Sequence, residues 1–99
     1  MRGVVRQTAL EQSANLSDEF GANVFLKRED LQIVRSYKIR GAYNKISSLP
    51  ADVLARGVVC ASAGNHAQGV ALSCQKLRIY GKIFMPAPTP QQKVRQVKM

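Results

Sequence analysis

The sequence is poor in the residues on which disulfide frameworks and metal centres depend. Its 99 residues include two cysteines, one histidine and no tryptophan. Cys60 and Cys74 are too few for a disulfide framework, and their spacing with His66 fits no metal-site pattern. We therefore predict that the chain binds no metal, and we expect both cysteines to be buried thiols.

Long hydrophobic stretches are also missing. No segment approaches the roughly eighteen consecutive apolar residues that a membrane span needs, and residues 1–13 lack the apolar stretch and cleavage site of a signal peptide. These absences predict a cytoplasmic protein without a membrane partner. The 45% share of hydrophobic residues is ordinary for a globular chain and allows a modest core.

Acidic residues are scarce, since six Asp and Glu stand against fifteen Lys and Arg and leave a formal net charge of +9. Clustered cations neutralise phosphates, so this charge would suit a nucleic acid or an anionic surface. The cations are spread along the chain, however, and few aromatic residues lie among them for base stacking. We predict no nucleic-acid partner, although a small basic binding module stays open as the alternative.

Hydrophobic periodicity predicts helices that alternate with strands. The helices are expected at residues 9–20, 36–48, 67–77 and 91–99. The strands are expected at residues 23–29, 57–61 and 80–86. This alternation is typical of a three-layer α/β domain with a mostly parallel sheet.

The predicted domain is small, and its sheet and its last helix look incomplete. Three strands make a short sheet whose two faces can be covered only if more chain follows, and the last helix reaches Met99 without a stop signal. We therefore expect residues 1–99 to form a single partial domain.

The stretch ASAGNHAQG, residues 61–69, stands where a predicted strand passes into a predicted helix. Ligands of open α/β sheets bind at such places, because helix starts supply unpaired N–H groups. Gly64 allows close backbone approach, and polar side chains are contributed by Ser62, Asn65, His66 and Gln68. A carboxylate would suit this loop. The alternative is purely structural, with Gly64 serving a turn, Asn65 a helix cap and His66 the solvent.

Lys38 is the second candidate. It falls in the first turn of its predicted helix beside Arg35 and Arg40, and both the helix terminus and the like charges disfavour an ammonium group. We expect its pKa to be lowered, which would make it a candidate for a Schiff base with a carbonyl substrate or with pyridoxal phosphate. An ordinary solvated lysine is the alternative.

Three segments together resemble a known family. SYKIRGA, residues 36–42, with Glu29 and Asp30 upstream, resembles the pyridoxal-phosphate attachment motif of the fold type II enzymes, the tryptophan synthase β family that includes the serine and threonine dehydratases. ASAGNHAQG is similar to the substrate loop of that family, and residues 85–98 resemble the segment that follows it. The order and separations agree, and the stretches around Lys38 and the loop are most similar to biosynthetic threonine dehydratases.

The resemblance implies a role for each candidate residue. Lys38 would hold pyridoxal 5'-phosphate covalently, release it to the substrate amine and then remove the α-proton. Tyr37 would lie against the pyridine ring, and Asn65 would bond the phenolic oxygen of the cofactor. The substrate carboxylate would be held by the loop residues Ser62, Gly64, Asn65, His66 and Gln68.

The implied reaction converts L-threonine, with L-serine as the alternative substrate, to a 2-oxo acid and ammonia. For threonine the product is 2-oxobutanoate, on the route to isoleucine. Family members commonly associate, so a homo-oligomer is implied for the complete enzyme. The glycine-rich loop that cradles the cofactor phosphate lies beyond Met99 in the family. We therefore expect the 99-residue chain alone to be inactive and to need the remainder of the catalytic domain, with a non-catalytic truncated relic as the alternative.

Overall fold

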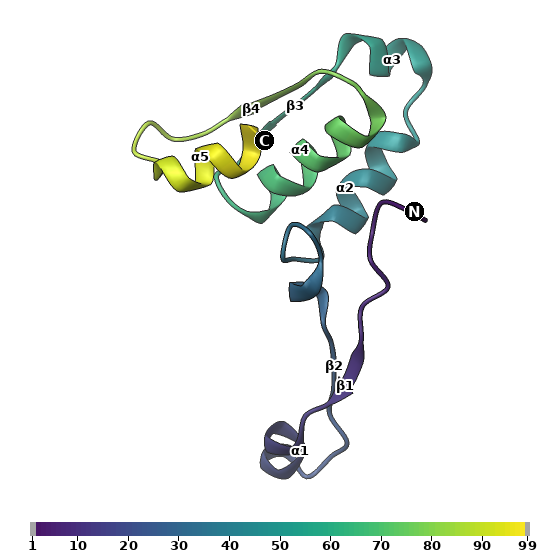
Figure 1. Ribbon diagram of the computed structural model, residues 1–99, viewed down its shortest axis with the longest axis vertical. Coiled ribbons are helices and arrows are strands. Elements are labelled where there is room, and N and C mark those ends of the chain that lie inside the picture. Colours follow the sequence, from purple (N-terminus) through teal and green to yellow (C-terminus); the bar gives the residue numbers. More distant parts are fainter. Residues whose placement is uncertain (1, 99) are drawn as a thin grey trace.

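A computed structural model describes residues 2–98 and divides them into two regions (Figure 1). The arm, residues 10–27, projects away from the body, residues 38–98, so the molecule is elongated, with principal extents of 50, 34 and 18 Å. The arm contains β1 (Leu10–Gln12), α1 (Ala14–Phe20) and β2 (Phe25–Lys27). A short 3-10 helix, Glu29–Leu31, follows β2 and leads to the body.

The body begins with two helices, α2 (Lys38–Ser47) and α3 (Ala51–Arg56). A β-α-β unit follows, made of β3 (Val58–Ala61), α4 (Asn65–Leu77) and β4 (Gly81–Phe84). The last element is α5 (Gln91–Lys98), which packs against α4. No helix within residues 2–98 is both long and apolar enough to cross a bilayer.

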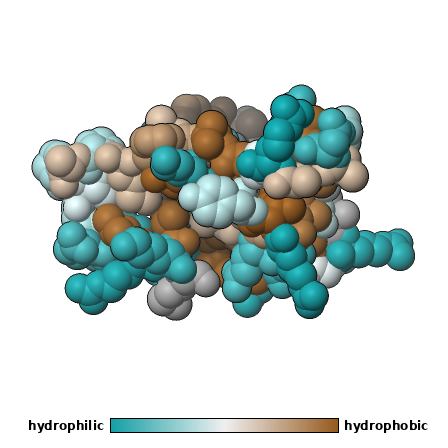
Figure 2. Space-filling model, turned by 90° about the horizontal axis from the view of Figure 1, so that it is seen from above, coloured by the Kyte–Doolittle hydropathy of each residue, from teal (hydrophilic) through white to brown (hydrophobic). Residues whose placement is uncertain are grey.

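The sheet of the body confirms the predicted α/β class. β3 and β4 pair in parallel, with a register that runs from Val58 opposite Gly81 to Ala61 opposite Phe84. Apolar residues from the sheet and its helices meet in one core, formed by Ala42, Ile46, Val70 and Cys74 with Val58, Cys60 and Ile83 against it. The opposite face of the sheet is exposed to solvent, since Val59 on that face is 71% exposed. Figure 2 shows hydrophobic surface between hydrophilic side chains at this end of the molecule.

The arm corrects two predictions. The predicted helix at residues 9–20 exists only from Ala14 to Phe20, because the Ser13 hydroxyl accepts the Leu16 N–H at 3.2 Å and starts a new helix there. The residues before it form β1 instead. The predicted strand at residues 23–29 is β2, but it pairs antiparallel with β1 and lies outside the parallel sheet. Gly21 ends α1 as expected, in a left-handed conformation with φ of 60°.

The predicted elements of the body are nearly all confirmed, with small shifts at their ends. α2 begins at Lys38 with Tyr37 as its N-cap, one residue beyond the predicted cap Ser36. The Ser36 hydroxyl still accepts the Lys38 N–H at 3.4 Å. α4 begins two residues earlier than predicted. α3 was not predicted at all, although Pro50 precedes it as its N-cap. The predicted end of the last helix, Met99, lies outside the described residues.

The two cysteines differ in burial. Cys74 is buried, as predicted, whereas Cys60 is only partly buried, and both are free thiols. Burial raises the pKa of each thiol above its ordinary value. Both thiols are therefore protonated at neutral pH, and they contribute as small side chains in and against the core.

Candidate active site

A cleft lies in the body between α2, β3 and the start of α4. Its walls are largely apolar, and the lining residues include Tyr37, Lys38, Val58, Cys60, His66 and Val70. Lys38 comes from α2 and His66 from α4, so two different elements place these polar groups around one cavity. An apolar cleft with a few convergent polar groups is the ordinary form of a small-molecule site.

Lys38 is the first residue of α2, and its side chain is exposed at the cleft. Its Nζ lies 5.4 Å from the centre of the Tyr37 ring, and it forms no ion pair within residues 2–98. The expected neighbouring cation Arg40 is not free, because its guanidinium makes two bonds with the Glu29 carboxylate, at 2.9 and 3.0 Å. The Lys38 amine is thus unpaired and accessible.

The loop that follows β3 is organised by Ser62. The Ser62 N–H donates to the Phe84 carbonyl at 3.0 Å and so continues the pairing of β3 with β4. Its hydroxyl accepts from the Gly64 N–H at 3.2 Å and from the Ala67 N–H at 3.3 Å. Ser62 therefore satisfies two N–H groups at the start of α4, the function that the structural alternative assigned to Asn65.

Gly64 and Asn65 lie at the very start of α4. Gly64 has a φ of −120°, which is not the left-handed conformation that favours glycine, and a Cβ placed on it would meet nothing within 4 Å. The alternative in which Gly64 serves only a turn therefore lacks the positive φ that usually requires glycine there. Asn65 is the first residue of the helix and is exposed. Both residues leave room beside the N–H groups of α4 for an incoming group.

The predicted residues are not all brought to one place. The cleft gathers Tyr37, Lys38 and His66, whereas Ser62, Gly64 and Asn65 lie in the turn beside it. Gln68 is half-buried and lines a different cleft with Val34 and Ala71. The predicted binding roles of these residues stay predictions.

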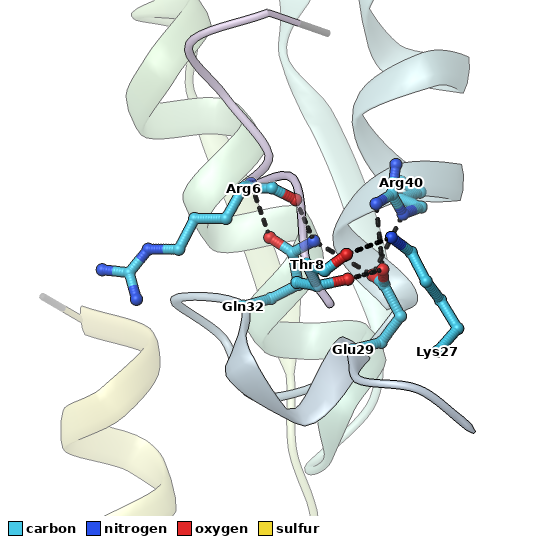
Figure 3. Close-up of polar contacts among 6 residues, drawn as sticks. All are labelled: Arg6, Thr8, Lys27, Glu29, Gln32 and Arg40. Carbon is cyan, nitrogen blue, oxygen red and sulfur yellow. Dashed lines mark hydrogen bonds and ion pairs between the residues drawn. The ribbon is translucent and has the colours of Figure 1, made fainter. Parts of the chain in front are cut away.

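Sequence reasoning missed a polar junction that connects the arm to the body. We define the junction as the six residues of Figure 3: Arg6, Thr8, Lys27, Glu29, Gln32 and Arg40. The Glu29 carboxylate is its centre and accepts bonds from Arg40, from the Thr8 hydroxyl at 2.8 Å and from the Gln32 amide at 3.1 Å. These bonds, above all that from Arg40, lower the pKa of Glu29 to about 2 despite the opposing effect of burial.

Gln32 holds the N-terminal segment within this junction. It is 3% exposed, and its side-chain oxygen accepts the Arg6 N–H while its side-chain N–H donates to the Arg6 carbonyl, both at 2.8 Å. The sequence signal was slight: Glu29 stood out only as part of an acidic pair before Lys38. The hydrophobic periodicity of the sequence gives no sign that residues 6–8 lie beside residue 32.

A second feature that sequence reasoning missed is the close approach of α4 to α2. A Cβ placed on Gly69 would lie 3.1 Å from both the carbonyl carbon and the carbonyl oxygen of Lys38. The second glycine of ASAGNHAQG thus faces the backbone of Lys38 itself. The first glycine, Gly64, faces open space.

Comparison with known proteins gives a consistent result. The profile of the family described as pyridoxal-phosphate dependent enzyme matches residues 1–99. The chain is 61% identical over 98 residues to the biosynthetic L-threonine dehydratase IlvA of Halalkalibacterium halodurans, with 99% of this chain and 24% of that protein covered. It is 57% identical over 99 residues to the IlvA of Bacillus subtilis, with 100% of this chain and 24% of that protein covered.

Solved structures agree with this comparison. The processed form of threonine deaminase isoform 2 from Solanum lycopersicum superposes with a TM-score of 0.88 at 52% identity, over 96% of this chain and 26% of that one. Maize serine racemase superposes with a TM-score of 0.87 at 37% identity, over 95% of this chain and 29% of that one. The chain thus spans about a quarter of the length of the proteins it matches.

Proposed function

The chain belongs to the pyridoxal-phosphate-dependent enzyme family, and we propose that it carries the lysine and the substrate loop of a threonine dehydratase. The observation that carries this proposal is the position of Lys38. Lys38 is the first residue of α2, and its unpaired amine lies in an apolar cleft. The cleft is also lined by His66, from the first turn of α4, the helix that follows the predicted substrate loop. The names of the relatives support L-threonine as the substrate.

The residues of the cleft fit pyridoxal phosphate in their chemistry. An accessible amine that no carboxylate neutralises can bond to the cofactor aldehyde, and the adjacent Tyr37 ring offers an aromatic face for the pyridine ring. Asn65 at the exposed start of α4 would bond the phenolic oxygen. When bound, the cofactor supplies an electron sink that stabilises the carbanion left by loss of the α-proton.

The remaining steps fall to side chains of this chain. Lys38 would hold the cofactor and, once the substrate amine has taken its place, would accept the α-proton at its Nζ. The N–H groups at the start of α4 favour a negative charge and would bind the substrate carboxylate. The loop residues that would take part are Ser62, Gly64, Asn65 and His66, whereas Gln68, which was also predicted to bind the carboxylate, lines a different cleft.

The proposed net reaction, the conversion of L-threonine to 2-oxobutanoate and ammonia, needs no oxidant or reductant. L-Threonine loses its α-proton and its β-hydroxyl as water, and the released enamine takes up water to give 2-oxobutanoate and ammonia. L-Serine would react in the same way to a three-carbon 2-oxo acid. We propose that the protein acts in the cytoplasm as a homo-oligomer. The groups that hold the cofactor phosphate would come from the part of the relatives' length that this chain does not span.

The test is the Lys38→Ala variant of the full-length protein. We expect it to lose the absorption band of the covalently bound cofactor. We also expect 2-oxobutanoate formation to fall by at least about 10²- to 10⁴-fold, the usual contribution of a proton-transferring side chain. Lys76→Ala, an exposed lysine in the last turn of α4, is the control and should keep both signals. A cofactor band that survives Lys38→Ala would show that our assignment of the lysine is wrong.

A further inference from the structure

Gly69 lies in the middle of α4, where the chain gains nothing from the conformational freedom of glycine. Its φ is not positive, and glycine weakens a helix interior relative to alanine. The helix stability that glycine costs must be offset by a close contact that a side chain at residue 69 would prevent. A Cβ at this position would lie 3.1 Å from the carbonyl carbon and oxygen of Lys38 and 3.3 Å from the Ile39 nitrogen.

The surroundings of this contact are tightly closed. Ile39 is 1% exposed, and Ala67 and Ser73 are fully buried. The Ser73 hydroxyl donates to the Gly69 carbonyl at 2.7 Å, which holds this turn of α4 in place. Because a close-packed interior transmits displacement, an added methyl group at residue 69 would have to push the backbone of Lys38 and Ile39 aside.

We propose that Gly69 is a positioning residue for Lys38, an inference that rests on the proposed function of that lysine. The contact joins the two halves of the candidate active site. On one side is the first residue of α2, which carries the amine, and on the other is α4, whose first turn carries Asn65 and His66. The missing side chain at residue 69 therefore sets the separation between the Lys38 amine and the substrate loop. A displacement of about 1 Å in such a pair can lower a rate about 10²-fold.

Gly81 provides a matched control. A Cβ at Gly81 would lie 2.7 Å from the Cys74 Sγ, so Gly81→Ala would also disturb the packing of α4. Cys74 lies on α4 beyond Gly69, in the hydrophobic core and away from the start of the helix. Both substitutions should destabilise the fold, but only Gly69→Ala pushes directly on Lys38.

The experiment measures the reactivity of Lys38 in the full-length protein freed of cofactor. The protein is treated with pyridoxal, which lacks the phosphate, and borohydride traps the adduct. Peptide masses then give the modification rate of Lys38 relative to that of Lys45, an exposed lysine on the same helix. A parallel series on the loaded enzyme gives kcat and KM for L-threonine.

For Gly69→Ala we expect the Lys38 to Lys45 ratio to change about tenfold or more and kcat to fall by up to about 10²-fold, with a smaller change in KM. For Gly81→Ala we expect a lower denaturation midpoint with the ratio within about twofold of wild type. A folded Gly69→Ala protein with an unchanged ratio would overturn the proposal. So would equal changes in the ratio for the two variants.

A second variant covers the case in which Gly69→Ala does not fold. Ser73→Ala removes the hydroxyl that holds the Gly69 carbonyl without adding an atom. For Ser73→Ala we expect the ratio of Lys38 to Lys45 modification to change by less than the tenfold expected for Gly69→Ala. Such a change would support the positioning role, and an unchanged ratio would contradict it. Because trapping needs no bound cofactor, these results stay separate from the Lys38→Ala test of the proposed function.

Discussion

The arm and the body are stabilised in different ways. No residue of β1, α1 or β2 is buried, and the large apolar side chains Leu10, Phe20 and Phe25 are each more than half exposed. In the body, Ile39 and Ala67 are almost completely enclosed. The body therefore depends on apolar packing, whereas the arm depends on short-range hydrogen bonds and on the junction that ties its base to the body.

This contrast explains where the candidate active site lies. All the predicted site residues belong to the body or to the residue just before it. Precise placement of reacting groups needs rigid surroundings, and only the body supplies them. The arm influences the site indirectly, because Arg40 of the junction lies two residues after Lys38 on the same helix.

The largest expected effect tests the packing of the body. Ile39→Ala should lower the free energy of unfolding by about 2 to 5 kcal/mol, because it leaves a cavity at a residue that is 1% exposed. Leu10→Ala on the arm, where the side chain is 64% exposed, should change it by no more than about 0.5 kcal/mol. Denaturant unfolding of the full-length protein measures both. Equal losses would remove the distinction between the two regions.

A smaller effect is expected at the junction. Gln32→Leu should cost about 1 to 3 kcal/mol, because it deprives the Arg6 N–H and carbonyl of their partner at a buried position. The loss should appear first as faster hydrogen exchange of the Arg6 amide. Gln12→Leu is the control, since among residues 2–98 the Gln12 side chain bonds only the exposed Asn23 side chain, at 3.3 Å. If Gln32→Leu leaves Arg6 protected, the junction does not hold the N-terminal segment.

The smallest expected effect concerns pH. The pKa of Glu29 falls from 4.5 to about 2 on folding, chiefly through the bonds from Arg40. A carboxyl group with a lowered pKa stabilises the folded state fully above its unfolded value and loses that contribution as the pH falls toward the folded value. Stability should therefore decline between about pH 5 and pH 2 more steeply in the wild type than in Glu29→Gln. If the stability of the two proteins changes with pH in parallel, the ion pair of Glu29 with Arg40 contributes nothing to the stability of the folded state.

Sequence patterns were most reliable where a local cause fixes the structure. Gly21 ends α1 because its left-handed conformation suits glycine, and the alternation around residues 57–84 gave the β-α-β unit. The prediction of a helix over residues 9–20 was right from Ala14 onward and wrong before it, because an apparent helical period ran across the Ser13 cap. The short helix α3 was missed because six residues are too few to display a period.

Family motifs in the sequence identified Lys38 and the loop that begins α4, because each motif is a local run of residues. The sequence by itself thus determined the β-α-β unit of the body, the lysine at the start of α2 and the family to which the chain belongs. Only the tertiary structure decided that β2 pairs with β1, that Gln32 holds Arg6 and that Gly69 faces the Lys38 backbone. These contacts join residues far apart in the chain, and a local hydrophobic period carries no information about such partners.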